Sequence, residues 1–172
     1  NVGASAGRNL GVENTTSPVL AFIEDDGVVD PSFFTSMEHL LLKRPDAIVV
    51  RGRIVALKYP MISMLSRAYD LGNEVRECIL DIEGATCIRR KDFVACGGYN
   101  ADIFHGEGIE LQERLVKQRP DGVILYNPEA VMQHDFAEGL WGLWEKGKRI
   151  AKADKQPLAL FPLTEARWQR LR

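Results

Sequence analysis

Three consecutive acids, Glu24, Asp25 and Asp26, directly follow an apolar run at residues 19–23. A continuous apolar run of this kind is typical of a strand buried on both faces of a parallel α/β sheet. Like charges this close repel one another, and each loses hydration as it nears the core. A bound Mg²⁺ or Mn²⁺ that bridges to a diphosphate would relieve both costs. The alternative is a polar loop that caps the next helix, but Asp30 already fills that role in the pattern.

Two further acids, Glu107 and Glu110, open a predicted helix at residues 107–117. Residues three apart lie on the same helix face. One of these carboxylates could act as a general base if its pKa were raised toward neutrality. Acids in the first turn also favour the helix dipole, which is a structural explanation, and both alternatives stay open here.

A histidine, His134, closes a predicted strand at residues 130–133. A lone histidine is more often structural than a ligand. At the end of a strand in the same layer as the acids, however, His134 could complete a metal site, because imidazole binds such metals.

Arg8, Asn9 and Arg90 stand where a phosphate could bind. Arg8 and Asn9 follow a glycine-rich helix entry and could face a phosphate or a nucleotide base. Arg90 belongs to a run of three cations after a predicted strand, and either phosphate binding or solvation explains it. The chain contains neither GxGxxG nor GxxxxGK[ST], so it supports neither a Rossmann nor a P-loop site.

Strands and helices alternate along the chain, which predicts an α/β layered domain with a mostly parallel sheet flanked by helices. We expect strands at 19–23, 47–57, 83–88, 123–126 and 130–133, the last two separated by Asn127-Pro128. We expect helices at 31–43, 61–78 and 107–117, and a short helix that ends near Asn14.

The length of 172 residues and a hydrophobic fraction of 45% suit one globular domain. The net charge of -2 does not indicate nucleic-acid binding. Three scattered cysteines without a CxxC pair argue against a zinc site and fit reduced thiols in the cytosol. We see no signal peptide and no apolar run of the roughly 20 residues that span a bilayer. The first residue is Asn1, so we expect the chain to be cut from a longer one.

Positive charge gathers at the C-terminal end. Residues 140–172 carry eight Lys/Arg and three Asp/Glu, a net +5, whereas the remainder carries 14 basic and 21 acidic residues, a net -7. Two tryptophans, Trp141 and Trp144, precede the basic residues and give a basic amphipathic pattern. Such a segment could lie on an anionic membrane surface, and a helix that packs on the body is the alternative.

Four segments in order resemble the GT-A glycosyltransferases of family 2. They are GASAGRNLGVENTTSPVLAFIEDDGVVDPSFF, GATCIRRKDFVACGGYN, HGEGIELQERL and LYNPEAVMQHDF. They correspond to that family's RNxG–strand–DxD region, its small-residue, arginine and GGF segment, its GEDxDLxxRL motif and its closing PxAxxxH. The resemblance implies a partial GT-A-like domain at 1–138, the C-terminal two thirds of a catalytic domain, followed by a basic amphipathic extension at 139–172.

The resemblance also implies an activity. The family moves a sugar from a nucleotide-diphosphate sugar to a hydroxyl of a carbohydrate or lipid-linked acceptor, with inversion at the anomeric carbon. Asp26 would then contact Mn²⁺ or Mg²⁺ at the DxD position, and His134 would be a second metal or diphosphate contact. The implied donor-binding residues are Arg8, Asn9, Glu24, Asp25 and Arg90. Family members often work in polysaccharide biosynthesis on envelope acceptors, so we expect a cytoplasmic protein that could be peripheral at the inner membrane face.

The chain departs from the family pattern in two places. Gly108 stands where the family usually has its catalytic Asp, and glycine cannot accept a proton. Glu107 or Glu110 could take over as the base, or the chain could be an inactive member that binds a nucleotide-sugar or a protein partner. The family's first strands, which usually hold the nucleotide base, are missing, so we expect an exposed sheet edge that a second copy could cover. A nucleotidyltransferase is a third alternative, but its glycine-rich basic loop would lie in the missing start.

Overall fold

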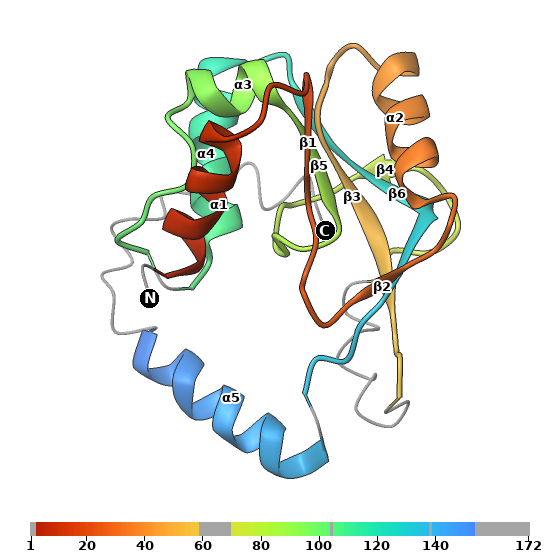
Figure 1. Ribbon diagram of the computed structural model, residues 1–172. Helices are drawn as coiled ribbons and strands as arrows, with labels where there is room; N and C mark the ends of the chain where they lie inside the picture. Colours follow the sequence, from red (N-terminus) through yellow and green to blue (C-terminus); the bar gives the residue numbers. More distant parts are fainter. Residues whose placement is uncertain (1–2, 59–69, 104, 138, 154–172) are drawn as a thin grey trace.

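The computed structural model describes residues 3–58, 70–103, 105–137 and 139–153 (Figure 1). The strands in these residues are β1 (Val19–Phe22), β2 (Val28–Val29), β3 (Ala47–Val55), β4 (Arg76–Glu77), β5 (Thr86–Arg89) and β6 (Val123–Gln133). The helices are α1 (Ala4–Glu13), α2 (Phe33–Lys43), α3 (Arg90–Ala95), α4 (Glu107–Gln118) and α5 (Gly139–Ala153). None of these helices is long and apolar enough to cross a membrane.

The strands form one mixed sheet in the order β1-β5-β3-β6-β2, with β4 also paired to β6. Only β3 and β6 run parallel among the described strands; the other neighbours are antiparallel. The α/β layered prediction is therefore confirmed, but the expectation of a mostly parallel sheet is wrong. The apolar runs that suggested it reflect burial under helices on both faces, and that burial does not depend on strand direction.

Helices cover both faces of the sheet (Figure 1). On one face, α1, α3 and α4 bury residues that include Val12, Phe93 and Leu111 against β3 and β5. On the other face, α2 buries Phe33 and Met37 against β3 and β6. The centre of the sheet is thus sealed on both sides, and polar side chains that could do chemistry lie at its margins.

Two element predictions need correction. The predicted helix at 61–78 lies partly outside the described residues, and residues 70–78 are not helical. Gly72 has a φ of 96° there, and its amide donates to the Asp70 carboxylate, which makes a turn that leads into β4. The two predicted strands at 123–126 and 130–133 are one strand, β6. A register shift between Gly52 and Arg53 of β3 accommodates the Asn127-Pro128 interruption.

The helix start predicted at Asp30 is displaced. The N-cap of α2 is Ser32, and Asp30 contributes its backbone carbonyl, which accepts the Phe33 amide at 2.9 Å. Asp30 therefore does not cap α2 through its side chain.

At Gly52, β3 lies close to both β6 and α2, which gives a test of the packing. A Cβ at Gly52 would lie 2.5 Å from the Ala130 carbonyl oxygen and 2.9 Å from Phe33 Cε2. We expect Gly52→Ala to lower the free energy of unfolding by about 1–3 kcal/mol in urea denaturation, because backbone must move. Gly7→Ala is the matched control, since a Cβ there meets nothing within 4 Å. In helix α1 it should be neutral or stabilise by up to about 1 kcal/mol, and equal effects of the two changes would contradict the packing described.

Candidate functional site

The three acids lie in a turn between the end of β1 and β2. The Gly27 amide donates to the Glu24 carbonyl at 3.2 Å, which closes the turn. Asp25 and Asp26 are exposed, whereas Glu24 is half-buried and points back toward the body. The triplet is thus divided: two carboxylates face solvent and the third belongs to a separate cluster.

Asp26 meets His134 at the outer edge of this turn. Val28 of β2 pairs with Gln133 of β6, so the residues just before β2 lie beside the residue just after β6. Asp26 Oδ1 is 3.0 Å from His134 Nε2; the Asp26 side chain is 72% exposed and that of His134 is 16% exposed. His134 and the acids are more than a hundred positions apart in the chain. The pairing of β2 with β6 brings His134 beside Asp26.

This pair fits a divalent cation as a partial ligand set. It offers carboxylate oxygen and imidazole nitrogen, both of which bind Mn²⁺. Among the described residues there is no group of three or more His, Cys, Asp or Glu that could hold a metal. Among the described residues, Asp26 and His134 would therefore be the two that hold the cation, and further oxygen ligands would be needed to complete its coordination.

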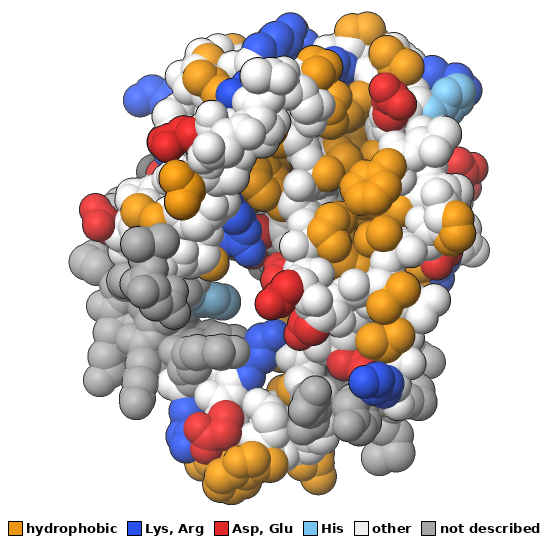
Figure 2. Space-filling view, viewed as in Figure 1, with side chains coloured by type: hydrophobic (Ala, Val, Ile, Leu, Met, Phe, Trp, Pro, Cys, Tyr) orange, Lys and Arg blue, Asp and Glu red, His pale blue; other side chains and the backbone are white. Residues whose placement is uncertain are grey.

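A second cluster forms on the inner side of the turn. Arg8 Nη2 of α1 is 3.7 Å from Glu24 Oε1, and the Arg8 guanidinium lies over the Tyr99 ring at 5.3 Å. Gly84 packs so closely on Glu24 that a Cβ there would lie 2.5 Å from Glu24 Cγ. Figure 2 shows acidic, basic and histidine side chains bordering a hollow between α5 and the strand ends. Arg8 and Glu24, both predicted to bind the donor, are brought together here.

Glu83 completes this inner cluster, and the sequence analysis missed it. Its Oε1 accepts the Gly108 amide at 2.6 Å, at the first turn of α4. Burial, and then the negative charge of Glu107, raise the pKa of Glu83 to about 7. The available signal was an acid at the start of the predicted strand 83–88, directly before the small residues Gly84 and Ala85 that begin one of the segments resembling the family.

The two candidate bases on α4 have different surroundings. Glu107 lies close enough to Glu83 for its charge to raise the pKa of that carboxyl. Glu110 is instead bound by Arg114, whose Nη2 and Nε donate to its two carboxylate oxygens, each at 2.6 Å. Arg114 also donates to the Cys96 carbonyl at 2.7 Å. Glu110 thus ties α4 to the end of α3.

Asn9 and Arg90, both predicted to contact the donor, make backbone contacts. Asn9 Nδ2 donates to the Tyr99 carbonyl at 2.8 Å, and Asn9 Oδ1 accepts the Tyr99 amide at 2.9 Å. Gly98 leaves room for this, since a Cβ there would lie 2.7 Å from Asn9 Oδ1. Arg90 Nη1 donates to the Val12 carbonyl at 3.0 Å. Both side chains hold α1 against the segment around α3.

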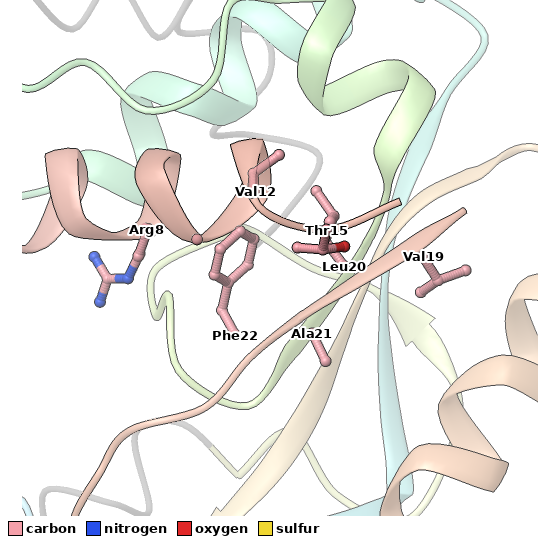
Figure 3. A pocket seen from close by; sticks show the side chains of 8 residues that line it. Arg8, Val12, Thr15, Val19, Leu20, Ala21 and Phe22 are labelled. Carbon is pink, nitrogen blue, oxygen red and sulfur yellow. The ribbon is translucent and has the colours of Figure 1, made fainter. Parts of the chain in front are cut away.

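A cavity of about 270 Å³ adjoins Arg8 between α1 and β1 (Figure 3). Apart from Arg8 and Thr15 its lining is apolar or glycine, and β1 is the terminal strand of the described sheet. It therefore offers contact surface beside the inner cluster rather than further catalytic groups.

The similarity to a known protein family covers several of the same segments. The family model described as Glycosyl transferase family 2 matches residues 1–93, which include α1, the acidic turn and Glu83. The chain belongs to glycosyl transferase family 2. A search of curated proteins found no match.

Several solved structures share the fold of this glycosyl transferase family 2 chain. The mannosyltransferase PcManGT from Pyrobaculum calidifontis, in complex with GDP-Man and Mn²⁺, is 13% identical with a TM-score of 0.61, over 94% of this chain and 47% of that chain. GalNAc-T7 with UDP, GalNAc and Mn²⁺ is 15% identical with a TM-score of 0.59, over 77% and 30%. S. aureus TarS is 9% identical with a TM-score of 0.52, over 74% and 25%. The chain therefore spans less than half of each of these proteins, and the expected GT-A fold is confirmed.

The contacts of Asn9 predict a structural role that can be measured. We expect Asn9→Ala to lower the free energy of unfolding by about 2 kcal/mol, because it leaves the amide and carbonyl of buried Tyr99 without partners. Asn14→Ala is the control, since the Asn14 amide makes one exposed contact to the Leu10 carbonyl, and it should change stability by less than about 0.5 kcal/mol. A stable Asn9→Ala protein with weakened nucleotide binding would instead assign Asn9 to the donor.

Proposed function

We propose that this protein transfers a sugar from a nucleotide-diphosphate sugar to a hydroxyl acceptor, with inversion at the anomeric carbon. The observation that carries the proposal is the contact between Asp26 and His134 at 3.0 Å. The two residues are the DxD-like and closing-histidine positions of the family resemblance. The related folds that hold Mn²⁺ with UDP or with GDP-Man support a divalent cation and a nucleotide donor.

Asp26 and His134 would hold Mn²⁺ or Mg²⁺. When bound, this cation would neutralise the negative charge that develops on the leaving diphosphate. Arg8 would offer its guanidinium to the donor from the inner cluster, where Glu24 already orients it. Asp25 lies exposed in the same turn and would face the donor or its water shell.

The metal site gives a direct test by calorimetry. UDP and GDP are titrated into the protein with and without Mn²⁺, and we expect binding that requires Mn²⁺. Asp26→Asn should weaken this binding at least tenfold, because an amide replaces an anionic ligand, whereas Asp25→Asn should weaken it less. Asp121→Asn, an exposed change in the turn before β6, is the control and should bind like the wild type. Nucleotide binding that depends on neither Mn²⁺ nor Asp26 would overturn the assignment of Asp26 as a metal ligand.

An inactive family member that binds a nucleotide-sugar or a partner is the second candidate. The observation that favours it is Gly108 at the position of the family's usual catalytic acid. Release of UDP or GDP from a sugar donor separates the two, because a binding module shows Mn²⁺-dependent binding without turnover.

We further propose that α5 contacts an anionic membrane surface. Leu140, Trp141 and Trp144 are 80%, 73% and 62% exposed, and α5 also carries several lysines and an arginine. Lys146, in the middle of α5, places its Nζ 3.7 Å from the centre of the Phe136 ring, which ties the helix to the segment before it while the tryptophans are exposed. Exposed aromatic and basic residues on one helix suit the interface of anionic lipids.

Vesicle co-sedimentation tests this contact. We expect the protein to bind vesicles of phosphatidylserine and phosphatidylcholine, and to bind pure phosphatidylcholine weakly. The double change Trp141→Ala and Trp144→Ala should reduce binding to the mixed vesicles by about tenfold or more. Leu42→Ala removes an equally exposed apolar side chain from α2 (72% exposed) and should have no effect. Equal binding by all variants would mean that α5 does not carry the contact.

A further inference from the structure

The first turn of α4 has no room for a side chain at Gly108. A Cβ there would lie 2.5 Å from the Leu80 carbonyl oxygen and 2.8 Å from Glu83 Oε1. The space is instead used by the Glu83 carboxyl, whose Oε1 is 2.6 Å from the Gly108 amide nitrogen. A carboxyl therefore stands at this place in the fold, although it comes from the segment before β5 rather than from α4.

The surroundings of Glu83 fit a group that exchanges a proton. Glu83 is half-buried, so it is shielded from most solvent without being sealed in the core. The charged groups that act on it are Glu107 of α4 and Arg8 of α1, and Arg8 Nη2 also lies 3.7 Å from Glu24 Oε1 in the turn after β1. Burial and Glu107 raise the pKa of Glu83 to about 7, and an acid with that pKa exists in both protonation states near neutral pH.

Tyr99 is an independent sign that the inner cluster is incomplete. The residue is 2% exposed, and its hydroxyl has no hydrogen-bond partner among the described residues. The carboxylates of Glu83, Glu107 and Glu24 all lie near enough to raise the pKa of that hydroxyl, secondary to its burial. A buried hydroxyl without a partner beside several acids is costly, and a bound polar group would relieve it.

We propose that Glu83 is the catalytic base of this transferase. The inference rests on the proposed glycosyl transfer. The acceptor oxygen forms a bond to the anomeric carbon of the nucleotide-diphosphate sugar while the bond from that carbon to the diphosphate oxygen breaks. The diphosphate leaves with the electron pair, and the acceptor's hydroxyl proton passes to the Glu83 carboxylate. Glu107 is a positioning residue that sets the proton affinity of Glu83, and Glu110 is held by Arg114.

The test compares Glu83→Gln, Glu107→Gln and Glu77→Gln in the full chain. Glu77 of β4 is exposed and serves as the control. The probes are GDP-mannose and a panel of UDP-sugars with Mn²⁺, and the readouts are nucleotide release between pH 5.5 and 9 and calorimetric binding of UDP and GDP. Glutamine keeps an oxygen for the Gly108 amide, so Glu83→Gln should fold and bind nucleotide like the wild type.

We expect wild-type turnover to fall as the pH decreases through about 7, because a base must be deprotonated. Glu83→Gln should lower kcat at least 100-fold with little change in donor KM. Glu107→Gln should keep turnover and move the acidic limb to lower pH, since it removes the negative neighbour. Should Glu83→Gln fail to fold, Glu83→Asp decides: turnover should persist at a reduced level with a displaced acidic limb.

Two results would overturn the assignment. One is a Glu83→Gln or Glu83→Asp protein with wild-type turnover and an unchanged acidic limb. The other is loss of turnover in Glu107→Gln, which would make Glu107 the base. A wild-type protein that binds UDP or GDP with Mn²⁺ but releases no nucleotide from any donor would overturn the proposed transfer itself, and the base assignment with it.

Discussion

The pairing of β3 with β6 is the constraint on which the rest of the molecule depends. These two long strands run parallel through the middle of the sheet, and β6 also pairs with β2 and β4. Gly52 permits the close approach of β3 to Ala130 and to α2. Because β6 continues past the bulge at Asn127-Pro128 to Gln133, it ends beside the acidic turn. The position of His134 follows from that continuity.

The acidic residues are arranged in two groups that face different partners. Asp26, which is exposed, and His134, which is half-buried, form an outer pair whose carboxylate and imidazole suit a divalent cation. Glu24, Glu83 and Glu107 form a shielded inner group with Arg8 and Tyr99. Charge repulsion among buried acids is costly, so one of them must take a proton or a cationic partner. In the transfer that we propose, the outer pair would hold the cation and the inner group would take the proton, so the two functions would lie on different residues.

Several residues of the family motifs also have a structural function. Asn9 holds both backbone groups of Tyr99, and Gly98 leaves the space in which it does so. Arg90 binds the end of α1, and Arg114 joins α4 to α3. Residue type alone suggested a donor contact for Asn9 and Arg90. The contacts that these residues make in the structure instead hold helices in place around the site.

The sequence by itself determined the α/β class, most of the strands and helices, and the two residues of the outer pair, Asp26 and His134. Hydrophobic runs and turn residues act locally, so these features can be recognised without knowledge of the tertiary structure. It did not determine strand direction, since an apolar run records burial and not the orientation of its neighbour. It also did not indicate Glu83, the base that we propose. Residue identity pointed to α4, where Glu107 and Glu110 stand, but only the packing of Leu80 and Glu83 against Gly108 decided which carboxyl occupies that space. Contacts between residues that are distant in the chain arise only in the tertiary structure, and they distinguish the two carboxyls. Glu110 is bound by Arg114, whereas burial and the charge of Glu107 raise the pKa of Glu83 to about 7.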